Sequence, residues 1–202
     1  IKEYSNLLIS NGLTTQDDSY HGVTYAKEFG KAAYITKATA QLMRDFGSVP
    51  APISSWIMGM HMESLGVRME RHCANALAVA RWLDADSRIS WVSYPGLEGD
   101  KYHALAEKYM PNGTCGVISF GVPGGREKVS AFLDHLKMVS IATHVADARS
   151  CTLYPAGTTH RQLTDEQLEE AGVGIDLVRL SCGIENAADI IADLDQALAS
   201  IQ

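Results

Sequence analysis

The sequence predicts an α/β (α+β) fold, with a small mixed sheet covered by helices, mainly on one face, and a helical segment before it. Two observations carry this prediction. Apolar strand-like runs alternate with helical patterns after residue 84, and a long stretch with helical periodicity precedes them. In addition, the 202 residues are 46% apolar, which is enough for one domain with a core, or for a small domain with an ordered extension.

Helices are predicted for most of the chain between residues 21 and 83. Residues 1–20 are polar and irregular, and a helical pattern then runs from about His21 to Phe46 with a bend near Gly30. Gly47 and Pro50 end this pattern, because glycine closes helices and the residue before a proline avoids the α region. A long helix is expected over residues 53–83, where apolar side chains recur at three- and four-residue steps: Met62, Leu65, Met69, Cys73, Ala76, Ala80 and Leu83. Core packing explains the methionines at 58, 60, 62 and 69 better than a flexible binding surface does.

The remaining residues predict alternating strands and helices. Strands are expected at 89–94, 115–121, 138–145 and 177–181, and helices at 103–109, 127–137 and 165–171. Thr164 is suited to cap the third of these helices, and Asn186 to begin a final one. No internal repeat or linker is present, so the one plausible domain boundary lies near residues 48–85.

Charge and cysteine usage exclude several classes of protein. Seventeen basic and 24 acidic residues give a net charge of −7, which argues against nucleic acid or an anionic membrane as the main partner. No apolar run approaches the length of a membrane span, and no signal-peptide layout is present, so we expect a cytoplasmic protein. The four cysteines have neither zinc-ligand nor disulfide-framework spacing, and we interpret them as small buried residues; no metal site is expected.

Arg179 stands in the middle of the apolar run Asp176-Leu-Val-Arg-Leu-Ser181, nineteen residues after the hydroxyl-rich loop Ser150–His160. Taken alone, it is most simply a strand arginine on a half-exposed face. The alternative is that it binds a carboxylate, because a planar guanidinium matches two carboxylate oxygens at once.

These two stretches resemble the C-terminal half of the Cys/Met-metabolism enzymes that use pyridoxal phosphate, in particular the O-acetylhomoserine sulfhydrylase branch. Three further stretches are similar to that branch: Ser19–Gly30, Glu63–His72 and Tyr94–Leu97. The resemblance runs from about residue 17 to the end of the chain. It implies a C-terminal domain like that of fold-type I pyridoxal-phosphate enzymes.

The resemblance also implies which parts of the complete enzyme this chain contains. Residues 1–48 would be a helical extension belonging to the end of an N-terminal cofactor domain. Residues 49–202 would form the C-terminal domain, joined by the long helix 53–83. The lysine that holds the cofactor, the ring-stacking aromatic residue and the phosphate-binding groups would lie outside this chain, so we expect no catalytic residue here and no activity of the chain alone. The partners would be an amino-acid substrate with sulfide or a thiol, the cofactor domain, and further copies in a homotetramer.

Particular site residues follow from the same resemblance. Arg179 would hold the α-carboxylate of the substrate, and the backbone N–H of His144 would assist it, at a position where the family usually has Ser or Asn. Ala146 replaces a usual glycine, which matters if the backbone needs a positive φ there. Tyr154 and Gly157 replace a His and a Ser of the family's loop.

Four other residues are candidates for lining the site. Thr159 and His160 belong to the hydroxyl-rich loop, and the pKa of a histidine suits proton transfer. A structural, internally hydrogen-bonded loop is the more common use of such a sequence. Tyr20 and His21 would either line the entrance to the site or begin a helix.

The sequence therefore predicts the C-terminal part of an O-acetylhomoserine sulfhydrylase. The complete protein would be a pyridoxal-phosphate-dependent transferase or lyase that converts O-acetylhomoserine, with sulfide or a thiol, to homocysteine or methionine and acetate. The alternatives are a cystathionine γ-synthase or methionine γ-lyase type of enzyme, or a non-catalytic α/β module for binding or oligomerisation.

Overall fold

The computed structural model describes residues 10–201. Irregular structure is expected over residues 1–20; residues 1–9 lie outside the described residues, and the expectation is wrong for part of the rest, where Ser10–Thr14 and Asp18–Tyr20 are short helical segments. The chain divides into two compact units, Ile1–Met60 and His61–Gln202. Each unit is described by itself below. None of the helices in the described range is both long and apolar enough to cross a membrane.

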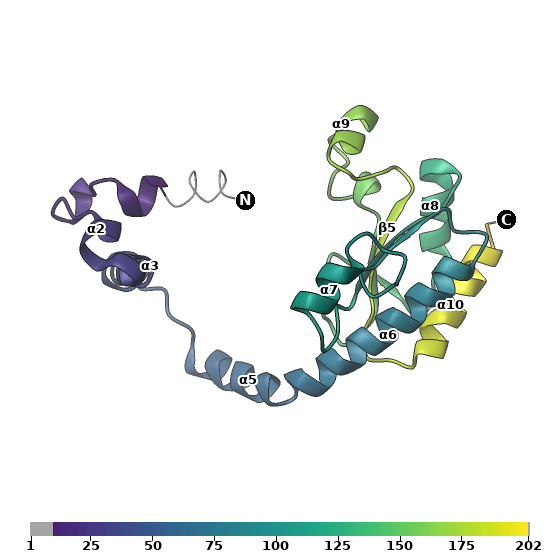
Figure 1. Ribbon diagram of the computed structural model, residues 1–202, viewed down its shortest axis with the longest axis horizontal. Coiled ribbons are helices and arrows are strands. Elements are labelled where there is room, and N and C mark those ends of the chain that lie inside the picture. The colour runs from purple at the N-terminus through teal and green to yellow at the C-terminus, as the bar shows by residue number, and fades with distance from the viewer. Residues whose placement is uncertain (1–9, 202) are drawn as a thin grey trace. The chain divides into compact units, whose positions relative to one another are not determined.

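The first unit is a succession of short helical segments (Figure 1). Between residues 25 and 46 they follow one another without a gap, and Gly30 and Gly47 adopt positive φ angles of 52° and 65°, so the predicted bend and end of this region are confirmed. Tyr25 is fully buried, and its hydroxyl donates to Oε1 of Gln41 at 3.0 Å. The segments are η1 (Ser10–Thr14), η2 (Asp18–Tyr20), α2 (Tyr25–Phe29), η3 (Gly30–Ala32), α3 (Ala33–Lys37), η4 (Ala38–Met43) and α4 (Arg44–Phe46).

The single long helix predicted over residues 53–83 is two helices in the structure, α5 (Pro52–Glu63) and α6 (Leu65–Ala85). Ser64, with φ −98° and ψ 1°, separates the two helices. Its hydroxyl contacts the carbonyl of His61, and Nη2 of Arg68 donates to the same carbonyl at 2.8 Å. Serine side chains compete for backbone groups in this way, which accounts for the interruption.

The predicted apolar stripe is buried only in the C-terminal part of α6, because Leu65 at the start of that helix is 40% exposed and Met69 and Cys73 are only partly buried. Ala76, Val79, Ala80 and Leu83 of α6 are buried. Every residue of α5 is exposed, however, and the interpretation of its methionines as core residues is wrong for the described chain: Met58, Met60 and Met62 are each more than half exposed.

The second unit contains a mixed five-stranded sheet in the order β1-β2-β5-β4-β3. Only β3 and β4 are parallel, and the other neighbouring pairs are antiparallel. The outer strands are shorter than predicted, and β4, which follows the 138–145 region, was not predicted as a strand. The strands are β1 (Val92–Ser93), β2 (Val117–Gly121), β3 (Ser140–Ile141), β4 (Cys151–Leu153) and β5 (Leu177–Ser181).

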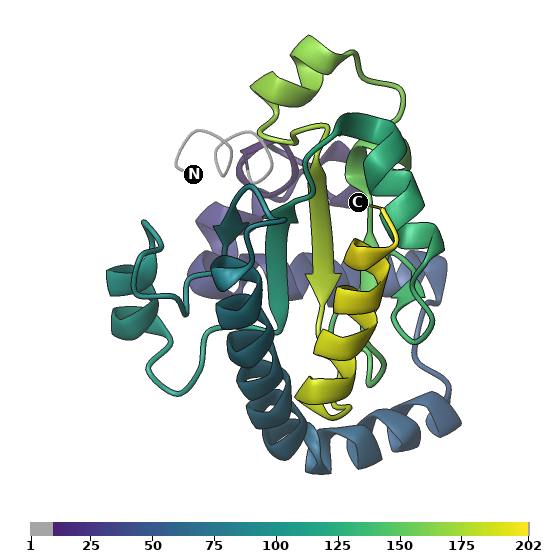
Figure 2. The ribbon, with the colours of Figure 1, turned by 90° about the vertical axis from the view of Figure 1, so that its right-hand side faces the viewer.

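Helices cover one face of this sheet, as predicted. In Figure 2, α6, α8 (Gly125–Asp134) and α10 (Ala187–Ala199) lie on the same side of the strands. Ile118 and Phe120 of β2, with Val178 and Leu180 of β5, are fully buried in the core against them. Alternate residues of the two central strands, Ser119 and Arg179, lie opposite each other on the other face, and both are only half-buried.

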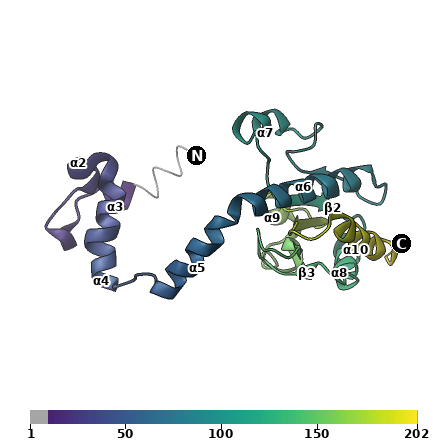
Figure 3. The ribbon, with the colours of Figure 1, turned by 90° about the horizontal axis from the view of Figure 1, so that it is seen from below.

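The remaining helices lie around the sheet. α7 (His103–Tyr109) stands away from the strands beyond the β1 edge (Figures 2 and 3). η5 (Pro155–Gly157) follows β4. α9 (Asp165–Glu170) is preceded by Thr164, whose side chain forms the predicted cap as part of a complete capping box. Asn186 caps α10 as predicted.

Candidate functional site

Arg179 lies at the centre of β5, the middle strand of the sheet. Its register partners are Ser119 of β2 and Leu153 of β4, on either side. The flanking residues Val178 and Leu180 point into the core, so the alternation of the strand directs the guanidinium to the opposite face. The short apolar sequence around Arg179 thereby fixes where its charge is presented.

The guanidinium of Arg179 is only partly satisfied within the described residues. Nη2 donates to the carbonyl oxygen of Thr143 at 2.9 Å. Nε is buried and has no hydrogen-bond partner among the described residues. A buried donor without an acceptor costs free energy, so this arrangement is suited to a ligand that brings an oxygen to Nε. A carboxylate matches that requirement because the guanidinium can donate to its two oxygens from two nitrogens.

The segment 143–147 runs beside Arg179. The side chain of His144 is exposed and turned toward Asp147, with Nδ1 3.5 Å from Oδ2. The backbone N–H of Arg149, more than the neighbouring imidazole, holds the pKa of Asp147 below its usual value. The structure therefore brings the predicted His144 near Arg179 through the backbone of Thr143, while the imidazole itself faces the acidic neighbour.

Ala146 adopts a φ of 56°, in the left-handed region that favours glycine. The positive φ anticipated at this position is thus present, although the residue is alanine. The backbone N–H of Ala146 donates to Oγ of Ser181 at 3.1 Å. Ser181 was not recognised from the sequence, because the contact joins residues 35 positions apart.

The loop after β4 is held by its own hydrogen bonds. Oγ1 of Thr159 lies 2.9 Å from Nδ1 of His160, and the backbone N–H of His160 donates to the carbonyl of Pro155. This geometry matches the structural interpretation of the loop. Tyr154 and Gly157 complement each other here, since a Cβ at residue 157 would lie 2.5 Å from the tyrosine ring.

A buried polar network holds the C-terminal end of β5. Glu185 accepts from both the backbone N–H and the hydroxyl of Ser150, at 2.6 and 2.9 Å, and that hydroxyl in turn accepts from the N–H of Gly183. His72 and Asn75 of α6 reach the same loop through the carbonyls of residues 182, 183 and 185. The network stabilises the end of the strand that carries Arg179. No local pattern in the sequence predicts this network.

The structure also shows the surroundings of Tyr20, His21 and Cys182. Tyr20 and His21 belong to the first unit, where the Tyr20 hydroxyl donates to the carbonyl of Ala40 and its ring stacks on Tyr25. His21 has a φ of 57° at the end of η2. Cys182, which follows β5, is fully buried, and burial raises the pKa of its thiol to about 12, so it is not a nucleophile at neutral pH.

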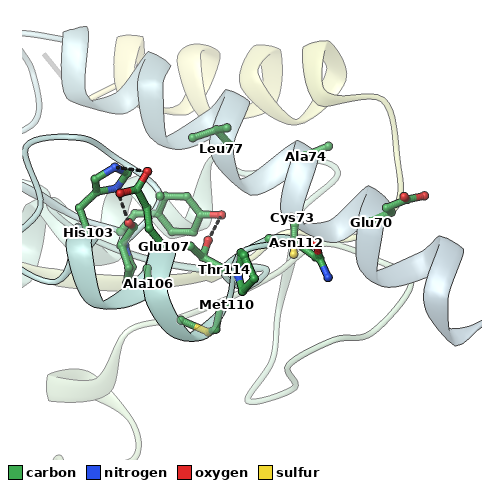
Figure 4. A pocket seen from close by; sticks show the side chains of 15 residues that line it. Glu70, Cys73, Ala74, Leu77, His103, Ala106, Glu107, Met110, Asn112 and Thr114 are labelled. Carbon is green, nitrogen blue, oxygen red and sulfur yellow. Dashed lines mark hydrogen bonds and ion pairs between the residues drawn. The ribbon is translucent and has the colours of Figure 1, made fainter.

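A cavity of about 490 Å³ lies between α6 and α7 (Figure 4). Cys73, Ala74 and Leu77 line it from α6, and His103 and Glu107 from α7. No residue of the predicted site lines it.

Comparison with known proteins identifies the family of this chain. Residues 13–199 match the family model of the Cys/Met metabolism PLP-dependent enzymes, where PLP is pyridoxal phosphate. The chain belongs to this family. Pyridoxal phosphate is therefore the cofactor associated with it.

The similar members of the Cys/Met metabolism family include sulfhydrylases. An O-acetyl-L-homoserine sulfhydrylase of Leptospira meyeri is 43% identical over 93% of this chain and 45% of its own length. A homocysteine synthase of Schizosaccharomyces pombe is 44% identical over 89% of this chain and 42% of its own length. The chain thus spans less than half the length of these relatives.

A solved structure of the family shares the fold. The crystal structure of an O-acetylhomoserine (thiol)-lyase of Campylobacter jejuni matches with a TM-score of 0.81 and 35% identity. The match covers 96% of this chain and 47% of that one, which contains a pyridoxyl-lysine adduct.

Proposed function

We propose that this chain is the C-terminal part of an O-acetylhomoserine sulfhydrylase and that Arg179 holds the α-carboxylate of the amino-acid substrate. The complete enzyme would take O-acetylhomoserine with sulfide or a thiol and release acetate, giving homocysteine or methionine. Relatives bearing the sulfhydrylase and homocysteine synthase names support the reaction class.

One observation carries the assignment of Arg179, namely its buried Nε without an acceptor among the described residues. An arginine that served only the strand would be expected to satisfy its buried donors internally. The single bond to Thr143 instead fixes one side of the guanidinium and leaves another donor for a ligand oxygen. The backbone N–H of His144, which follows Thr143 in the chain, would assist in holding the carboxylate.

The residues of this chain would contribute binding and orientation. Pyridoxal phosphate, when bound by the other part of the enzyme, supplies the electron sink for the chemistry. A carboxylate held by Arg179 fixes how the substrate Cα is oriented, and orientation governs the breaking of the Cα–H bond. The lysine that binds the cofactor and the groups that bind its phosphate would lie outside this chain.

The proposal includes partners for the chain. The cofactor domain would cover part of the exposed apolar surface of residues 29–67, and the complete protein would be a cytoplasmic homotetramer with transferase activity. Large exposed side chains in this range, such as Tyr34, Phe46 and Trp56, need such cover.

Substitution of Arg179 in the complete enzyme tests the assignment. Arg179→Lys should lower kcat/KM for O-acetylhomoserine by roughly 10- to 100-fold, since a hydrogen bond to a charged group is worth about 1.5–3 kcal/mol and lysine cannot reproduce the fork. Arg88→Lys is the matched control, because Arg88 pairs with Asp86 and Asp195 away from this face of the sheet. Near-normal kcat/KM in the Arg179 variant would show that Arg179 is a structural residue.

A further inference from the structure

Strand β5 holds the segment 143–146 at two points. Nη2 of Arg179 donates to the carbonyl of Thr143 at 2.9 Å, and Oγ of Ser181 accepts from the N–H of Ala146 at 3.1 Å. The two side chains lie two residues apart on one strand, so they share a face and reach the same segment. His144 lies between the two attachment points.

The second attachment stabilises an unfavourable backbone conformation. Ala146 has a φ of 56°, and a non-glycine residue in the left-handed region costs about 1–2 kcal/mol. Ser181 is 2% exposed, so water competes little for its hydroxyl. Without that hydroxyl the N–H of Ala146 would lose its acceptor. The positive φ of Ala146 would then be less stabilised.

We infer that Ser181 is a positioning residue that shapes the backbone around His144 for carboxylate binding beside Arg179. This inference rests on the proposed function, because it assigns Ser181 a role at the same carboxylate site. Ser181 acts through the segment and does not itself bind the substrate. Its loss should therefore weaken substrate binding and leave the chemical step nearly unchanged.

Ser181→Ala in the complete enzyme is the test, with KM and kcat measured separately for O-acetylhomoserine. KM should rise about three- to tenfold, the range expected for one hydrogen bond, while kcat stays within about twofold. In the chain itself, hydrogen exchange of the Ala146 amide should become faster, which reports directly on the lost bond.

Thr152→Val is the matched control. Thr152 is also buried, on the adjacent strand β4, but its hydroxyl donates to the backbone carbonyl of Arg179 at 3.2 Å from the helix-covered face of the sheet. It should lower thermal stability and leave KM unchanged. An equal rise in KM for both variants would reduce Ser181 to a structural residue.

The outcomes separate this inference from the proposed function. If Arg179→Lys lowers kcat/KM and Ser181→Ala leaves KM unchanged, the positioning role is wrong and the carboxylate site stands. If Arg179→Lys has no effect either, the proposed site itself is wrong.

Discussion

Asp193 of α10 shows how one buried carboxylate connects two elements. Its two oxygens accept from the backbone N–H groups of Lys137, Met138 and Val139, each at 2.8 or 2.9 Å. Burial alone raises the pKa of this carboxyl, but the three N–H donors and Gln196 outweigh it and hold the pKa below its usual value. The charged form is therefore favoured in the folded protein.

Asp193→Asn should destabilise the chain by about 1–3 kcal/mol at pH 7, because an amide cannot accept at both ends. Since the folded pKa is lower than the unfolded one, the stabilisation is complete above about pH 4 and is lost as the pH falls through the folded pKa. Urea unfolding at several pH values between 7 and 3 measures this, and the variant should lose less stability than the wild type on acidification.

Asp195→Asn is the control for this prediction. Asp195 lies two residues away on the same helix, and its partly exposed carboxylate pairs with Arg88. Exposed ion pairs contribute about 0–1 kcal/mol, so only a small change is expected. If the two variants lost equal stability, the hydrogen bonds from the backbone to Asp193 would contribute no more than an exposed ion pair, and the prediction would be wrong.

At the scale of elements, α9 depends on Thr164, the residue that precedes it and caps its N-terminus. The side chain of Thr164 accepts from the N–H of Gln167, and the Gln167 side chain accepts from the N–H of Thr164. Leu168 is the one residue of this six-residue helix that is fully buried. Packing alone therefore holds the helix weakly, and the cap matters.

Thr164→Ala should cost about 1 kcal/mol of stability, whereas Thr164→Ser, which keeps the capping oxygen, should cost only a few tenths. Thermal unfolding followed by circular dichroism gives both values. Equal losses for alanine and serine would show that the threonine methyl, not the cap, stabilises α9.

The elements that were predicted correctly depend on local patterns. β5 and α7 have the predicted bounds, because their apolar spacing and flanking turns are self-contained. β4 was missed because Cys151–Leu153 is too short to show a period and Pro155 follows at once. Ser64 divides the predicted long helix through contacts with His61 and Arg68 that spacing alone does not reveal.

The candidate site likewise has features that the sequence predicts and features that it does not. The orientation of Arg179 follows from the alternation of β5, which is visible in the sequence. The hydrogen bonds around it do not, since Arg179 reaches Thr143, and Ser181 reaches Ala146, only when segments 36 and 35 residues apart pack together. The exposed methionines of α5 were misinterpreted because the apolar character of a helix does not show whether the core of the same chain covers it.

At the scale of the whole molecule, exposed apolar side chains gather between residues 29 and 67. Phe46 is 78% exposed, Tyr34 73% and Trp56 61%. Sedimentation of the isolated chain should therefore show association that increases with concentration. Replacing Phe46 and Trp56 by serine should weaken it, whereas Tyr109→Ser, on α7 of the second unit, should not. A monomer at every concentration would contradict this prediction.

The isolated chain should also lack sulfhydrylase activity, because the proposed function assigns the cofactor lysine to another part of the protein. Purified chain with pyridoxal phosphate, O-acetylhomoserine and sulfide should form no homocysteine. Turnover that Arg179→Lys abolished would contradict the prediction, whereas turnover insensitive to that variant would indicate a contaminating enzyme.

The two faces of β5 have a consequence for how such a protein changes over generations. Val178 and Leu180 serve folding, while Arg179 and Ser181 face the proposed site, so neighbouring codons experience different constraints. Substitutions on the site face can alter ligand preference with little loss of core packing. An inserted or deleted codon within the strand, by contrast, would exchange the two sets at once. New specificities in this scaffold should therefore arise by replacement within the strand, with length changes confined to the loops.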